Sequence, residues 1–196
     1  MFDTKIANYT FKMWQTPPKE GLISRIKPSN GKYFTDKYQG LLDMDTLFKN
    51  LGKGIKVIKK DIKDGDLKGK IILTGAIDEY FNYCYGHLPY RGMKVKHIKS
   101  ERGLPTAVVN YPDLDMPFIR ITDYKKLGFK GQWLGIETPS NDRMYPIDNP
   151  YSQKMYKKYK ALADKKGILL CGRLATYKYI DMHIAIEKAL ELVETL

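Results

Sequence analysis

The sequence has few cysteines and no long apolar run, and these absences exclude several common classes of protein. Its 196 residues include only two cysteines, Cys84 and Cys171, too far apart in sequence to suggest a disulfide framework or a zinc site. No run of about eighteen apolar residues is present, so no transmembrane helix is predicted. The N-terminal residues also lack the apolar core of a signal peptide. We therefore expect a cytoplasmic protein that does not bind membranes.

Several motifs of cofactor and catalytic sites are missing as well. No G-x-G-x-x-G follows a strand, so no dinucleotide-binding fold is encoded in these residues. A phosphate-loop lysine and a serine-nucleophile elbow are also absent. The three histidines, His87, His97 and His183, are not clustered, whereas a metal site needs several converging ligands. We therefore predict no metal site and interpret these histidines as structural or solvated.

Basic residues and tyrosines are in excess. There are 34 lysines and arginines against 22 aspartates and glutamates, which gives a net charge of +12. The lysines are spread along the chain and no nucleic-acid-binding motif is present, so nucleic acid is not the favoured partner. A small anionic substrate such as a diphosphate, or a solvated surface, explains the charge equally well. The 15 tyrosines suit either half-buried strands or a site that combines rings with hydroxyl groups.

The hydrophobic pattern predicts an α+β fold. It has a mainly antiparallel sheet of about five or six strands, flanking helices and a C-terminal strand-turn-helix. The expected helices cover 2–15, 45–51, 77–81 and 151–166, and another follows residue 181. The expected strands cover 55–58, 70–73, 93–98, 107–111, 118–122, 132–138 and 168–170, and 139–150 is expected to be a loop.

The stretch 172–183, GRLATYKYIDMH, separates the last expected strand from the last helix. Asp181 lies at the start of that helix, where a carboxylate suits the positive end of the helix dipole. One helical face carries apolar residues, namely Met182, Ile186, Ala189, Leu190, Val193 and Leu196. Two interpretations remain open: a buried, capped C-terminal helix, or a helix N-terminus that faces an anion or an electron-rich ring.

Several stretches together resemble one family, and they occur in that family's order. They are 38–40 (YQG), 73–81 (LTGAIDEYF), 90–91 (YR), 107–111 (AVVNY), 120–125 (RITDYK), 144–147 (MYPI) and 172–183. The family is UDP-galactopyranose mutase, and the resemblance is to its C-terminal half. It implies 1–196 as a single domain, with 1–20 a remnant of the helical substrate domain, 21–150 the antiparallel sheet domain and 151–196 the segment facing the flavin.

The resemblance also implies a chemistry. Enzymes of this family are flavoprotein isomerases that interconvert UDP-galactopyranose and UDP-galactofuranose, the latter used in cell-wall polysaccharide biosynthesis. Reduced FAD acts as the nucleophile and forms a flavin-sugar adduct. The family's Rossmann-type FAD-binding domain has no counterpart in this sequence. We therefore expect no activity from this chain alone, and an exposed apolar patch that is covered by a separate FAD-domain chain or by self-association.

By resemblance, individual residues receive roles. Arg91 and Arg120 match catalytic and substrate-binding positions near the diphosphate, and Arg25 is a further catalytic candidate. The remaining substrate-binding candidates are Tyr145, Tyr179, Trp14, Tyr38 and Asn110, and the flavin-binding candidates are Arg173, Tyr179, Asp181 and Met182. Two alternatives stay open. Instead of a mutase that is completed by an FAD domain, the chain is a non-catalytic relative that binds a nucleotide-sugar or another anion, or a basic scaffold associated with nucleic acid.

Overall fold

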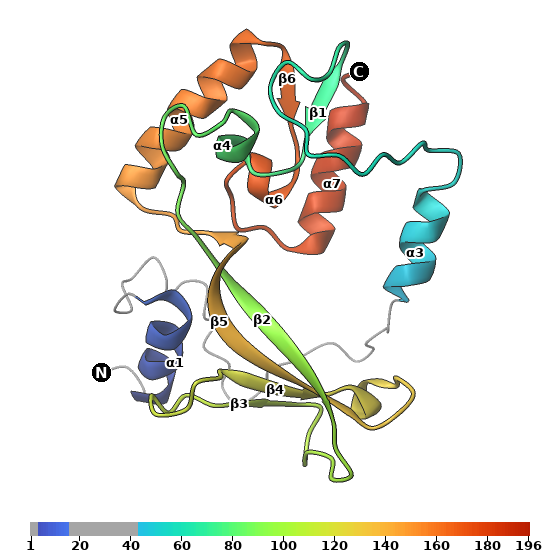
Figure 1. Cartoon of the computed structure of the whole chain (residues 1–196), viewed down its shortest axis with the longest axis vertical. Helices are drawn as coiled ribbons and strands as arrows, with labels where there is room; N and C mark the ends of the chain where they lie inside the picture. Colours follow the sequence, from blue (N-terminus) through green and yellow to red (C-terminus); the bar gives the residue numbers. More distant parts are fainter. Residues whose placement is uncertain (1–3, 16–42) are drawn as a thin grey trace. The chain divides into compact units, whose positions relative to one another are not determined.

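The computed structural model describes residues 4–15 and 43–196, which form two compact units (Figure 1). Of these residues, 4–15, 43–58 and 94–139 belong to the first unit, and 59–93 and 140–196 belong to the second. The helices are α1 (Thr4–Trp14), α3 (Met44–Leu51), α4 (Ile77–Tyr80), α5 (Pro150–Lys165), α6 (Gly172–Ala175) and α7 (Met182–Val193). The strands are β1 (Ile71–Leu73), β2 (Tyr90–Lys99), β3 (Val108–Asn110), β4 (Arg120–Asp123), β5 (Trp133–Pro146) and β6 (Ile168–Leu170).

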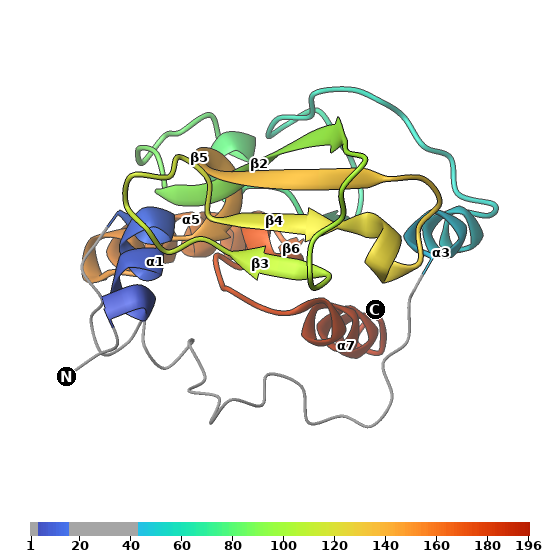
Figure 2. The same cartoon turned by 90° about the horizontal axis from the view of Figure 1, so that it is seen from below.

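The larger sheet has four strands in the order β2-β5-β4-β3, which Figure 2 shows side by side. β4 pairs antiparallel with both β3 and β5, so Arg120 lies opposite Asn110 on one side and Glu137 on the other. β2 and β5 are the longest strands and run from one unit into the other. The predicted α+β class with a mainly antiparallel sheet is therefore confirmed.

Two expectations about strands are wrong. The first concerns residues 55–58, which carry no strand, and the side chains of Ile55, Val57 and Ile58 are exposed. Alternating apolar residues form a strand only where another strand can pair with them, and no described strand does so here. The second concerns residues 139–150, because β5 continues through Pro146. Proline removes one donor from a ladder but its fixed φ suits extended backbone, so Pro139 does not end the strand.

In the first unit, a lysine fastens α1 to the loop between β3 and β4. The Lys12 ammonium group donates to three backbone carbonyls, those of Tyr111 at 2.8 Å, Asp113 at 2.7 Å and Phe118 at 2.8 Å. Three carbonyl acceptors match the three donors of an ammonium group. Desolvation is the main cause that lowers the pKa of Lys12 below its ordinary value. This contact fixes the helix that carries Tyr9 and Trp14.

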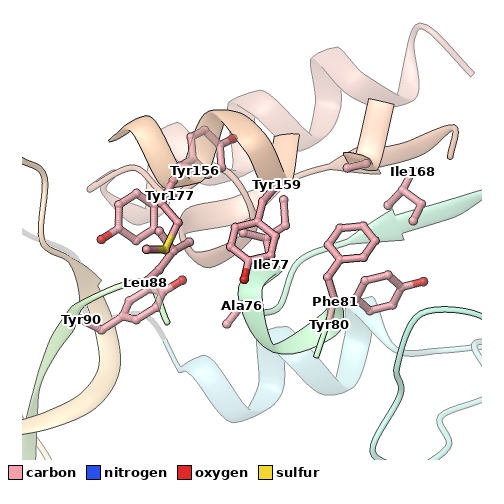
Figure 3. Packing of buried hydrophobic residues seen from close by; sticks show 12 residues of the cluster. Ala76, Ile77, Tyr80, Phe81, Leu88, Tyr90, Tyr156, Tyr159, Ile168 and Tyr177 are labelled. Carbon is pink, nitrogen blue, oxygen red and sulfur yellow. The ribbon is translucent and has the colours of Figure 1, made fainter. Parts of the chain in front are cut away.

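The second unit contains a core in which tyrosines predominate (Figure 3). Tyr159 and Tyr177 have no more than 1% of their surface exposed, and both hydroxyls donate to backbone carbonyls. Figure 3 shows that these rings come from α5 and from the segment before α7, and pack beside Ile77 of α4. The buried cluster consists of Ala76, Ile77, Tyr80, Phe81, Leu88, Tyr90, Met155, Tyr156, Tyr159, Ala163, Ile168 and Tyr177.

A separate two-stranded sheet lies beside this core. β1 and β6 pair in parallel, with Ile71 opposite Ile168 and Leu73 opposite Leu170. Figure 1 shows α5 and α7 on opposite sides of this pair. α5 begins at a capping box in which Asn149 and Ser152 satisfy each other's backbone N–H groups. The expected helices at 2–15, 45–51, 77–81 and 151–166 thus correspond to α1, α3, α4 and α5.

Candidate anion-binding site

The second unit brings together Tyr145 from β5, Arg173 from α6 and Tyr179 from the segment that follows α6. The rings of Tyr145 and Tyr179 stack with centroids 5.4 Å apart and planes inclined by 25°. The guanidinium carbon of Arg173 lies 4.9 Å from each ring centroid, within the range of cation–π attraction. Tyr179 is 41% exposed, so this aromatic–guanidinium cluster is open to solvent.

Backbone carbonyls, not carboxylates, hold the guanidinium group of Arg173. Its Nε and Nη2 atoms donate to the Ile180 carbonyl at 3.1 and 2.6 Å, and Nη1 donates to the Met144 carbonyl at 3.4 Å. Within the described ranges, no carboxylate forms an ion pair with Arg173. The group is therefore fixed in orientation while its positive charge stays uncompensated, which favours an anion at this surface.

Tyr177 connects the two stretches that carry the stacked rings. Its hydroxyl lies 2.7 Å from the Pro89 carbonyl and 3.0 Å from the Ile147 carbonyl, and its single proton is shared between these two acceptors. Ile147 follows Tyr145 by two residues, and Tyr177 precedes Tyr179 by two. Tyr177 has a φ of +48°, a left-handed conformation that is costly for a residue with a side chain. Burial and these contacts offset that cost and hold the two segments that carry the Tyr145 and Tyr179 rings.

Arg91 is also in the second unit, but it is buried rather than exposed. It is 4% exposed, and its Nη1 atom donates to the side-chain oxygen of Asn141. Desolvation lowers the pKa of Arg91 below its ordinary value, although a guanidinium group stays charged in proteins. A buried charge is costly unless it is hydrogen-bonded, so Asn141 supports the charged state.

The first unit brings the predicted residues Arg120 and Asn110 together. Arg120 donates from Nε to Asn110 Oδ1 at 3.1 Å and from Nη2 to the Tyr9 hydroxyl at 3.0 Å. Its Nη1 atom lies 3.4 Å from Glu137 Oε2, which is an ion pair between neighbouring strands. Much of the charge of Arg120 is thus matched by a carboxylate. Trp14 ends α1 in the same unit and is partly exposed.

The remaining candidates divide between the start of α7 and residues without a described position. Asp181 occupies the N-cap position of α7 as expected, and its carbonyl accepts from the Ala185 N–H at 3.0 Å. Its side chain makes no capping hydrogen bond, and Met182 beside it is exposed. Arg25 and Tyr38 lie outside the described residues. Among the residues with a described position, no group of three or more histidine, cysteine or acidic side chains could hold a metal ion.

Sequence reasoning missed Tyr9 and Glu137, which fix Arg120. Tyr9 fell in the apolar stripe predicted for the first helix, so its hydroxyl received no role. Glu137 could have been found from the pairing of strands 118–122 and 132–138, because opposite charges often face each other across strands. The register was the missing information, since a shift of one residue moves every side chain to the other face.

The fold and the cluster define an α+β protein with a fixed, uncompensated guanidinium group at an aromatic surface. The family model described as UDP-galactopyranose mutase matches residues 4–179. The chain therefore belongs to the UDP-galactopyranose mutase family. This confirms the resemblance drawn from its motifs.

Curated relatives agree with this assignment. The UDP-galactopyranose mutase of Mycoplasma genitalium is 31% identical, over 94% of this chain and 57% of that protein. A dTDP-fucopyranose mutase of Escherichia coli is 28% identical, over 99% of this chain and 60% of that protein. A probable UDP-galactopyranose mutase of Klebsiella pneumoniae is 25% identical, over 99% and 57%. The chain thus spans less than two thirds of the length of these relatives.

Proposed function

We propose that this chain binds the diphosphate of a pyrimidine nucleotide-sugar through the Tyr145–Arg173–Tyr179 cluster. The observation that carries the proposal is the stacking of two tyrosine rings, each beside a guanidinium group that forms no ion pair with a carboxylate of the described residues. Family membership supports it independently. The names of two relatives contain UDP-galactopyranose and dTDP-fucopyranose, which share a pyrimidine nucleoside diphosphate and a six-membered sugar ring.

The chemistry of a diphosphate matches this cluster. Phosphate oxygens accept hydrogen bonds from hydroxyl and guanidinium donors, and charge-assisted bonds are about twice as strong as neutral ones. Arg173 is already oriented by the Ile180 carbonyl, so binding needs little further ordering of its side chain. The exposed ring of Tyr179 adds an apolar surface beside the same anion. Positioning and electrostatics of this kind also stabilise a departing diphosphate.

Arg91 and Arg120 are proposed as further contacts to the substrate, with different strengths. Arg120 has Glu137 as an ion-pair partner, so an approaching phosphate must compete with that carboxylate. Arg91 is buried and contacts Asn141, so it acts on an anion mainly through its positive charge. Both assignments come from family resemblance rather than from the geometry of the aromatic–guanidinium cluster. Trp14 and Asn110 are proposed for the nucleoside side on the same basis.

The family resemblance implies reduced FAD, and we tested whether the described residues fit it. The only parallel strands in the described ranges, β1 and β6, are followed by Thr74 and Cys171, and α6 after β6 has only four residues. Neither turn provides the long helix N-terminus and glycine fingerprint that cradle a dinucleotide. These residues do not fit a whole FAD molecule. Isomerisation is therefore proposed only for an assembly that holds the flavin.

Calorimetric titration with UDP tests the proposal. Both tryptophans, Trp14 and Trp133, are in the first unit, so tryptophan fluorescence does not report directly on the aromatic–guanidinium cluster. We expect saturable binding to the wild-type chain. Tyr145→Phe and Tyr179→Phe should each weaken it by about 10- to 150-fold, because a hydrogen bond to a charged group contributes about 1.5–3 kcal/mol.

Tyr151→Phe is the matched control. Tyr151 is an exposed tyrosine of the same unit at the start of α5, and its hydroxyl has no role in the proposal. This variant should bind UDP like the wild type. The proposal fails if the wild-type chain does not bind UDP, or if all three phenylalanine variants bind equally well. A parallel titration with dTDP decides which pyrimidine nucleotide the chain prefers.

A further inference from the structure

The first unit contains a groove where the end of β2 lies beside the start of β5 (Figure 2). Its volume is about 650 Å³, which is within the usual range for small-molecule sites. The two segments that line it are joined by a hydrogen bond of 3.1 Å from the Ser100 N–H to the Gln132 carbonyl. The lining consists of Lys99, Ser100, Glu101, Gly131, Gln132 and Trp133. None of these residues has a role in the proposed nucleotide-sugar site.

An indole ring with a fixed position lines this groove. The Lys99 ammonium nitrogen lies 5.3 Å from the centroid of the Trp133 ring, within the range of cation–π attraction. The pyrrole edge of the same ring lies against Gly131, where an added Cβ would be 3.0 Å from Nε1 and Cδ1. Gly131 also has a φ of +88°, which a residue with a side chain rarely adopts. These neighbours hold the ring in place, yet Trp133 remains 37% exposed.

A second glycine allows the neighbouring loop to approach the groove closely. A Cβ at Gly103 would lie 2.8 Å from Asp123 Oδ2 and 3.3 Å from Gln132 Nε2. Asp123 is buried, and its carboxylate accepts from the Leu104 N–H at 3.0 Å and the Lys125 N–H at 3.1 Å. These contacts hold the loop close to the Gln132 side chain. The groove is therefore shaped before a ligand arrives, which lowers the entropic cost of binding.

The charges of the groove balance, although the chain as a whole has a net charge of +12. Lys99 and Glu101 carry opposite charges, so the groove does not favour an anion. Donors come from Lys99 and the Gln132 amide, and acceptors come from Glu101 and the same amide. A neutral ligand whose polar groups both donate and accept matches this mixed lining. Hydroxyl groups do both, and an apolar ring face suits the indole.

We infer that this groove binds a neutral sugar ring that stacks on Trp133 and bonds through its hydroxyl groups to Glu101 and Gln132. The faces of a sugar ring carry C–H groups, whose hydrogens meet the electron-rich face of an indole. A nucleobase also stacks on tryptophan. In a nucleotide-sugar, however, the base is joined to a diphosphate, whose charge this groove does not compensate. The site goes beyond the proposed function, because it gives the chain a second carbohydrate contact in the first unit.

NMR of the indole N–H groups tests the inference on the full chain. The chain has two tryptophans, so the Trp14→Phe variant assigns the resonance of Trp133. The probes are the methyl glycosides of galactose in both ring forms, of glucose and of mannose, with uridine as the nucleobase probe, each at millimolar concentration. We expect a saturable shift of the Trp133 resonance with at least one glycoside and no shift with uridine.

Saturation-transfer NMR on the same glycoside then compares variants. Trp133→Leu should abolish the signal, and Glu101→Ala should weaken binding by about 10- to 150-fold, because a hydrogen bond to a charged group is lost. Phe129→Leu is the matched control, since Phe129 is an exposed aromatic residue of the same unit outside the groove. A shift with uridine alone, no shift with any glycoside, or an unchanged signal in Trp133→Leu overturns the inference. UDP calorimetry tests the cluster of the second unit, so either proposal can fail alone.

Discussion

Replacing Tyr177 with phenylalanine tests whether one buried hydroxyl fixes the aromatic–guanidinium cluster. The substitution keeps the ring, which stacks on Tyr156 with centroids 5.7 Å apart and meets the edge of Tyr90 at 5.4 Å. It removes the donor to the carbonyls of Pro89 and Ile147. Tyr177 is only 1% exposed, so water does not readily replace that donor. Each carbonyl keeps another donor, the Ile147 N–H for Pro89 and the Ser152 hydroxyl for Ile147. The expected cost is therefore that of a lost hydrogen bond, about 0.5–1.5 kcal/mol, in the second unit.

Hydrogen exchange measured by mass spectrometry is the appropriate assay, because the two units need not unfold together. Peptides from α5 and β6 should exchange about 2- to 13-fold faster in Tyr177→Phe if they open with the whole unit. Tryptophan fluorescence during urea unfolding should be unchanged, since Trp14 and Trp133 are in the first unit.

The same variant should also lose affinity for UDP, because Tyr145 and Tyr179 are no longer held at a fixed spacing. Tyr151→Phe, at an exposed position, provides the control and should change stability by less than about 0.5 kcal/mol. Equal exchange rates in the two variants would refute the argument that the Tyr177 hydroxyl stabilises this unit. Faster exchange with unchanged UDP affinity would refute only its role in positioning the rings.

Three other predictions concern pH, backbone packing and the attachment of α1. Burial raises the pKa of Tyr156 to about 12, so this residue contributes fully to folding stability below its unfolded pKa of about 10 and loses that contribution as pH rises towards 12. Tyr156→Phe should reduce this loss of stability at alkaline pH, measured by urea unfolding at a series of pH values. In Gly92→Ala the new Cβ would lie 2.5 Å from the Asp142 carbonyl oxygen, which should cost about 1–3 kcal/mol or more, whereas Gly75→Ala meets nothing within 4 Å and should melt like the wild type. Lys12→Met should lower the free energy of unfolding of the first unit by about 1–3 kcal/mol, because three carbonyls lose this donor. The change should appear as a lower urea midpoint in tryptophan fluorescence.

The sequence predicted those parts of the fold that depend on local pattern. Helix periodicity located α1, α5 and α7, and short apolar runs located β1 and β6. The same rules failed at residues 55–58, because a strand exists only with a partner and its partner is not local. They also failed to decide whether the apolar face of α7 is buried, since periodicity shows that a face is apolar but not what lies against it. Met182, Ile186 and Leu190 are exposed in the described structure, so the interpretation as a buried helix is wrong. Both failures concern contacts with elements distant in sequence.

For the candidate site, motif resemblance selected residues but could not group them. It assigned Tyr145 to the substrate, Arg173 to the flavin and Tyr179 to both, and the described structure places all three side chains in contact. The hydroxyl of Tyr177 contacts the carbonyls of Pro89 and Ile147 near these side chains, and the resemblance gave Tyr177 no role. Side-chain hydrogen bonds between distant segments depend on tertiary packing. The periodicity of a single sequence does not predict them.

The three arginines Arg91, Arg120 and Arg173 show most clearly why residue type alone does not fix a role. Arg120 shares its charge with Glu137, so a phosphate gains less there than at an uncompensated group. Arg91 is buried and hydrogen-bonded to the amide of Asn141. Its charge attracts an anion through a medium of lower dielectric constant than water, but its guanidinium N–H groups are not exposed to bind that anion directly. Only Arg173 combines a fixed orientation, neutral acceptors and two adjacent tyrosine rings. If electrostatics governs binding, Glu137→Gln should therefore strengthen UDP binding through Arg120, whereas removal of an exposed carboxylate remote from the arginines should not.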